Sequence, residues 1–165
     1  MAYVPRRYVP KQLTRRDKRR AKKELNLSRK LYKKHVYHTR KKVPSFHSKT
    51  SKHILTAKKV YEIPEIMPSP LLAKKTGCSL GALQQIVKKG EGAYYSSGSR
   101  PNQTAQSWGL ARLASSITSG KAAAVDYDIL EKGCNHNKKA FILAKKSRKQ
   151  YKYGHSKTKK TIVSA

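Results

Sequence analysis

The side chains most often used in catalysis are few in this 165-residue chain, and they are not spaced for it. Its eight carboxylates form no convincing acid–base pair apart from Asp126 and Asp128, which a helix would place on different faces. Ser96 and Ser97 have no acid–base partner at a spacing typical of a nucleophile, and the sequence contains no glycine-rich phosphate loop. We therefore predict that the protein is not an enzyme and uses no cofactor.

The side chains best suited to bind a metal are Cys78, Cys134 and His136. Zinc sites are usually built from two close pairs of ligands, and here only Cys134 and His136 are close, so we predict no metal site. Two cysteines are too few for a disulfide framework. We expect Cys78 and Cys134 to be free, buried thiols, with a disulfide between them as the alternative.

Lysine and arginine supply the dominant chemistry of the chain, whose formal net charge is +31. Residues 1–60 contain 21 basic and 2 acidic side chains, residues 61–137 contain 8 and 6, and residues 138–165 contain 10 and none. Such cationic arms repel themselves, so we expect them to order only within a larger assembly, against nucleic acid or an acidic protein surface. The arm residues that are candidates for binding phosphates are Arg15, Arg16, Arg19, Arg20, Lys145, Lys146 and Arg148.

The charge distribution predicts three consecutive segments. Residues 1–49 form a basic N-terminal arm, which is extended over 1–13, helical over 14–34 and extended again over 35–48. Its helix has a thin apolar stripe of Ala21, Leu25, Ser28 and Tyr32, so we expect a partner surface to hold it. Residues 50–137 form a compact helical domain. Residues 138–165 form a basic tail with a short helix over 139–148.

Helix boundary signals in the central segment predict roughly five short helices. Ser69 followed by proline begins one helix and Gly77 ends it, Ser79 begins the next and Gly90 ends that one, and later helices cover 105–118 and 122–132. The fold class is therefore mainly α, with a small helical domain flanked by extended basic arms. No segment is apolar enough to span a bilayer, and the first residues lack the apolar core of a signal peptide, so we expect no membrane insertion.

The stretch LLAKKTGCSLGALQQIVKKG resembles the helix-turn-helix of bacterial repressors. Ala73 lies under the turn, Gly77 makes it, and Leu83, Ile86 and Val87 face inward. The resemblance implies that the second helix enters a DNA major groove with its outward polar residues, which are Gln84, Gln85, Lys88 and Lys89. Gly81 and Ala82 offer nothing to a base edge, so a purely structural use of the motif stays open.

The segment AYYSSGSRPNQT, residues 93–104, contains one charged side chain and is rich in tyrosine, serine and amides. We interpret it as a loop between two helices whose side chains form a short-range docking surface. The candidate partner-binding residues are Tyr94, Tyr95, Ser97, Arg100, Asn102, Gln103 and, just beyond the loop, Trp108.

The segments LAKKTGCS, KKGEGAYYSSGSRPNQT, SWGLARLASSIT and GKAAAVDYDILEKGC together resemble an uncharacterised family of small basic proteins encoded by large DNA viruses of algae and protists, including chloroviruses and mimivirus relatives. The resemblance implies a virus-encoded protein. Our leading hypothesis is a minor capsid protein inside the shell of an icosahedral virion, made in the host cytoplasm or nucleus. Its partners would be the major capsid protein, other minor capsid proteins and viral DNA. The alternatives are a DNA-binding, genome-condensing protein and a ribosomal protein.

Overall fold

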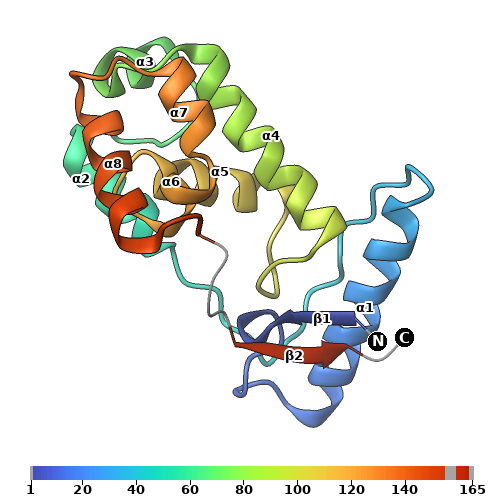
Figure 1. Ribbon diagram of the computed structural model, residues 1–165. Helices are drawn as coiled ribbons and strands as arrows, with labels where there is room; N and C mark the ends of the chain where they lie inside the picture. Colours follow the sequence, from blue (N-terminus) through green and yellow to red (C-terminus); the bar gives the residue numbers. More distant parts are fainter. Residues whose placement is uncertain (1, 155–158, 164–165) are drawn as a thin grey trace. The chain divides into compact units, whose positions relative to one another are not determined.

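The computed structural model describes residues 2–154 and 159–163, and this part of the chain is mainly helical, as predicted (Figure 1). Two short strands, β1 (Ala2–Pro5) and β2 (Lys160–Val163), pair with each other, and a single 3-10 turn, η1 (Arg6–Tyr8), follows β1. The helices are α1 (Arg15–Tyr32), α2 (Lys52–Tyr61), α3 (Pro70–Thr76), α4 (Leu80–Ser96), α5 (Ala105–Ser116), α6 (Lys121–Val125), α7 (Tyr127–Gly133) and α8 (Lys139–Tyr151).

The contacts within the chain define two units that differ from the three consecutive segments predicted from charge. The first, here called the basic unit, contains the described residues of 1–49, 91–108 and 157–165. The second, the helical unit, contains those of 50–90 and 109–156. Two boundaries between the units lie inside the predicted central segment, residues 50–137, and fall within the helices α4 and α5. Each unit is therefore built from segments that are not consecutive in the sequence.

The basic unit has its own small core, although charge alone predicted disordered arms. β1 and β2 pair antiparallel, with Tyr3 opposite Ile162, so the two ends of the described chain form one ribbon (Figure 1). The core beneath it is made by Val4, Tyr8, Leu25 and Val163, with Trp108 packed against them. These segments fold against one another, whereas charge alone led us to expect that only a larger assembly would order them.

Helix α1 is fixed within this unit along the predicted stripe. Thr14 caps its N-terminus by accepting a hydrogen bond from the Asp17 backbone, and Ala21, Leu25 and Ser28 are buried. A second apolar cluster places Ala21 against Leu13 and Val43. The prediction that a partner must hold the helix is wrong, since residues 43–46 and the 93–104 segment of the same chain cover its buried face.

The helical unit contains one contiguous apolar core, which includes Leu72, Leu83, Ile86, Leu113, Ile117, Leu130 and Phe141. The predicted boundary signals at its first turn are confirmed. The Ser69 hydroxyl accepts from the Leu72 backbone, Gly77 adopts a left-handed φ of 77°, and the Ser79 hydroxyl accepts from the Ala82 backbone.

Gly90 does not end a helix as predicted, because α4 continues through it to Ser96. A Cβ atom on Gly90 would lie 2.6 Å from the Cα of Gly109 on α5. The glycine therefore allows α4 and α5 to approach closely, which is a packing requirement rather than a termination signal. The predicted helix over 122–132 is instead two helices, α6 and α7, that meet at Asp126. The short helix predicted in the tail is confirmed as α8.

The expectation of free thiols is wrong, because Cys78 and Cys134 form a disulfide. It joins the turn between α3 and α4 to the end of α7. Two backbone hydrogen bonds flank it, from Ser79 to the Gly133 carbonyl and from Asn135 to the Gly77 carbonyl. The sequence separation of 56 residues gave no local signal for this pairing.

Candidate nucleic-acid interface

The charges of α1 are segregated by sign. Its two carboxylates, Asp17 and Glu24, are buried, and its basic side chains lie on the remaining surface of the helix. All nine are exposed or half-buried: Arg15, Arg16, Lys18, Arg19, Arg20, Lys22, Lys23, Arg29 and Lys30. Because an α-helix rises about 1.5 Å per residue, they follow an axis of roughly 27 Å without an exposed anion on the same helix.

The two carboxylates are turned inward by hydrogen bonds to a distant part of the chain. Asp17 accepts from the backbone and hydroxyl of Ser45, at 2.9 and 2.5 Å, and these bonds lower the pKa of Asp17. Burial alone would raise the pKa of Glu24, but the Lys41 backbone (2.8 Å) and His38 (2.9 Å) donate to it and bring it below its usual value. Both groups therefore hold the 38–45 segment on α1 as anions.

Arg40 connects the 38–45 segment to the predicted docking loop, residues 93–104. Its guanidinium donates to Ser28 Oγ at 3.0 Å, to the Tyr94 carbonyl at 2.5 Å and to Ser99 Oγ at 2.7 Å. It also lies 3.7 Å from the centroid of the Tyr94 ring, and burial lowers its pKa. Four segments of the basic unit thus meet at one planar cation.

Asn102, in a left-handed conformation with φ of 60°, makes a second junction. Its side-chain oxygen accepts from the Val43 backbone at 2.7 Å, and its nitrogen donates to the carbonyls of Val43 and Phe46 at 3.1 and 2.8 Å. The amide is therefore used inside the molecule. An amide with three partners of its own is a structural element of the basic unit rather than a free docking group.

The docking interpretation of residues 93–108 consequently needs correction. Tyr94 is buried, Asn102 is bonded to its own chain, and Trp108 packs edge-on against Tyr8. The segment is also not one loop, since its first four residues belong to α4. Of the other candidates, Ser97 and Arg100 are exposed, Tyr95 is half-buried, and the half-buried Gln103 accepts from the Ser107 hydroxyl.

Arg40→Lys is expected to lower the free energy of unfolding of the basic unit by about 2 kcal/mol, because an ammonium keeps the charge but cannot reach three acceptors in one plane. Trp108, the only tryptophan, lies in this unit and reports its unfolding by fluorescence. Arg100→Lys, at an exposed arginine in the 93–104 segment that Arg40 contacts, is the matched control and should have no effect. Equal stability of the two variants would contradict the role of Arg40.

The candidates on α4 are exposed as predicted, but their surroundings do not favour base reading. Gln85 lines an open depression of about 320 Å³ whose other wall, from α7, carries Asp128. Lys89 lies 3.5 Å from the buried carboxylate of Asp126. Gln84 and Lys88 remain exposed and unobstructed by these groups. A carboxylate beside the outward face of α4 would repel the phosphates that flank a major groove.

The candidates on α8 belong to the helical unit and are only partly available. Lys145 and Lys146 are exposed, with Lys145 5.2 Å from the Phe141 ring centroid. The Arg148 guanidinium lies 4.7 Å from the Tyr127 centroid and 4.5 Å from that of Tyr153. Arg148 is therefore held between two aromatic rings.

Fold and charge define this chain as a small, mainly helical, strongly basic protein. It belongs to the DUF5824 family, a family of unknown function, whose model matches residues 5–139. The comparisons with curated proteins and with solved structures found no match. Within the described residues, no helix is both long and apolar enough to cross a membrane.

Proposed function

We propose that this protein binds the phosphate backbone of nucleic acid and does not read the base sequence. The observation that carries the proposal is the separation of charge on α1, where nine basic side chains lie outward and both carboxylates are used inside the basic unit. Duplex DNA has one negative charge per about 1.7 Å of its axis, so a row of cations on a helix of this length can neutralise several phosphates.

The residue types favour sequence-independent binding over the sequence-specific binding of a DNA-binding regulator. The outward polar residues of α1 are lysines and arginines without amides between them, apart from the half-buried Asn26. On α4, which the helix-turn-helix resemblance would place in a major groove, Gly81 offers no side chain and Gln85 lies beside Asp128. Affinity would then come from released counterions rather than from base edges.

From the resemblance to viral proteins, we expect the polyanion to be a viral genome that the protein helps to condense. A minor capsid protein, our leading hypothesis from the sequence, remains a prediction without a specific observation in its favour. It required extended arms that thread between neighbouring subunits, and the described parts of those arms fold within the protein's own units.

Replacing Arg15, Arg16, Arg19 and Arg20 with alanine is expected to weaken binding to a 20-base-pair duplex strongly. Each lost phosphate contact should reduce the slope of log affinity against log salt by about 0.9, so the four together reduce it by roughly 3 to 4. Titrations at several salt concentrations, monitored by fluorescence anisotropy, measure this slope. Two duplexes of unrelated sequence should bind equally.

The matched control removes the same charge from the other unit, at the exposed lysines Lys139, Lys145, Lys146 and Lys149 of α8. This variant should keep most of the slope. Equal losses in the two variants would show a diffuse charge effect rather than an interface on α1. The absence of salt-dependent binding by the wild-type protein would exclude the proposed function.

A further inference from the structure

Three tyrosine rings gather at the C-terminal end of α1. Tyr32 belongs to the last turn of α1, Tyr37 to the loop that follows, and Tyr95 to the last turn of α4. The ring centroids of Tyr32 and Tyr37 are 6.1 Å apart and those of Tyr37 and Tyr95 are 5.2 Å apart. Tyr37 is 65% exposed. The three residues, here called the tyrosine cluster, place an aromatic surface in contact with solvent.

The backbone around the tyrosine cluster is firmly held. Helix α1 ends in a Schellman motif, in which Val36 donates to the Leu31 carbonyl at 3.0 Å and His35 donates to the Tyr32 carbonyl at 2.9 Å. His35 adopts the left-handed conformation that this motif requires, with φ of 60°. Tyr37 therefore extends from a defined turn, so its exposure does not come from a loose loop.

The inner side of the cluster is fixed by the buried junction described above. Tyr95 packs edge-on against Tyr94, with centroids 5.1 Å apart and planes at 89°, and its carbonyl accepts from the Ser28 hydroxyl. Tyr94 in turn lies against Arg40. Tyr95 is thus anchored, and Tyr37 rests against an anchored ring while its own ring stays open to solvent.

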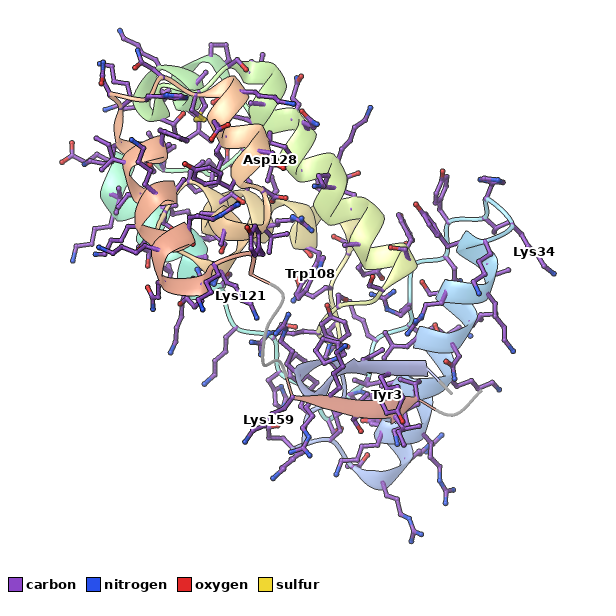
Figure 2. The ribbon with its side chains drawn as sticks, in the orientation of Figure 1. Tyr3, Lys34, Trp108, Lys121, Asp128 and Lys159 are labelled. Atoms are coloured by element: carbon purple, nitrogen blue, oxygen red, sulfur yellow. A yellow bond between two sulfur atoms is a disulfide. The ribbon has the colours of Figure 1, made fainter. Side chains whose placement is uncertain are left out.

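Exposed lysines lie beside the cluster in the sequence. Lys30, Lys33 and Lys34 are exposed at the end of α1, and Figure 2 shows Lys34 there. No carboxylate occurs in the sequence from residue 25 to residue 61. Glu91, one helical turn before Tyr95 on α4, is the single acidic residue of the basic unit's α4 segment. The local charge is therefore strongly positive.

We propose that the tyrosine cluster binds unpaired bases of single-stranded nucleic acid. A base stacks on the open ring of Tyr37, and the neighbouring phosphates lie on Lys33 and Lys34. Aromatic rings beside a cationic track are the arrangement used for single strands, because every base has a face that can stack. This inference rests on the proposed function and adds a preference that cations alone do not give, since paired bases in a duplex are not available for stacking on Tyr37.

The test uses the full chain and four probes at one salt concentration: a 12-residue oligo(dT), an oligo(rU) of the same length, an abasic 12-residue strand and a 12-base-pair duplex. Tyr37→Ala should weaken binding of the two base-containing strands about tenfold, a loss of the size expected for one stacked base. Its binding to the abasic strand and the duplex should not change. Tyr37→Phe, which keeps the ring, should bind all four probes like the wild type.

The outcomes separate this inference from the proposed function. If Tyr37→Ala binds oligo(dT) and oligo(rU) as tightly as the wild type while the α1 variant still loses duplex binding, the tyrosine cluster is not a base site and the proposed function stands. Equal losses for the abasic strand, or for an acidic peptide such as polyglutamate, would also overturn base stacking. If no nucleic acid binds, both ideas fail. An unchanged Trp108 emission spectrum verifies that each variant is folded.

Discussion

Asp126→Asn is expected to lower the free energy of unfolding of the helical unit by about 3–5 kcal/mol, the usual loss when one partner of a buried ion pair is removed. The Asp126 side chain has no solvent exposure. Its two oxygens accept from Arg112 at 2.8 and 2.7 Å, and one also accepts from Ser116 at 3.2 Å. The asparagine would keep the shape but leave the charge of Arg112 without its partner. Chemical denaturation monitored by circular dichroism measures the loss, and hydrogen exchange of the α6 and α7 amides assigns it to this unit.

The chain supplies a matched control two residues away. Asp128 is exposed, so Asp128→Asn removes the same charge and should change the stability by less than about 0.5 kcal/mol. Replacing Asp126 with leucine and Arg112 with methionine together should recover part of the loss, because no uncompensated charge is then buried. Similar stabilities for the Asp126 and Asp128 variants would mean that the pair with Arg112 is not a structural requirement.

The parts of the fold that could be predicted from sequence are those whose cause is local. A serine before a proline begins α3, and a glycine ends it in a conformation that other residues adopt only at a cost, so both signals lie within a few residues of the boundary. The inward residues of α4 follow the helical period in the same way. Such signals predicted the class of fold and most helices.

The parts that could not be predicted depend on partners far away in the chain. A glycine at position 90 is compatible both with the end of a helix and with close packing of two helices. The second applies here because of Gly109 on α5, which is distant in the sequence. The 93–104 segment looked like an exposed loop because it is polar. In the fold, however, the Tyr95 carbonyl accepts from Ser28, and the Ser99 hydroxyl and the Asn102 amide bond to residues 40–46. Residue type alone did not distinguish internal bonding from docking.

The candidate interface on α1 could also be predicted only in part. The sequence predicted the cations of α1, but no local pattern in it separates Asp17 and Glu24 from the basic residues beside them. In the fold, both are buried against groups more than ten residues away. The outward surface of α1 is therefore more cationic than its composition, and it is presented by a folded unit rather than by a disordered arm.

The disulfide also links residues that no local pattern connects, and its removal is the second large effect we expect. Replacing both Cys78 and Cys134 with serine should lower the free energy of unfolding by about 4 kcal/mol, the chain-entropy value for a loop of this length. The flanking backbone bonds of Ser79 and Asn135 remain, so the helical unit should still fold. Denaturation with and without reductant measures the change.

Reductant should destabilise the wild-type protein to the level of the double serine variant and leave that variant unaffected. Mass spectrometry of peptides from the unreduced protein verifies that the two thiols are joined. If the wild type unfolds at the same denaturant concentration after its disulfide is shown to be reduced, the bond adds nothing to stability. Binding to the duplex should survive reduction, because the arginines of α1 belong to the basic unit and the disulfide lies wholly within the helical unit.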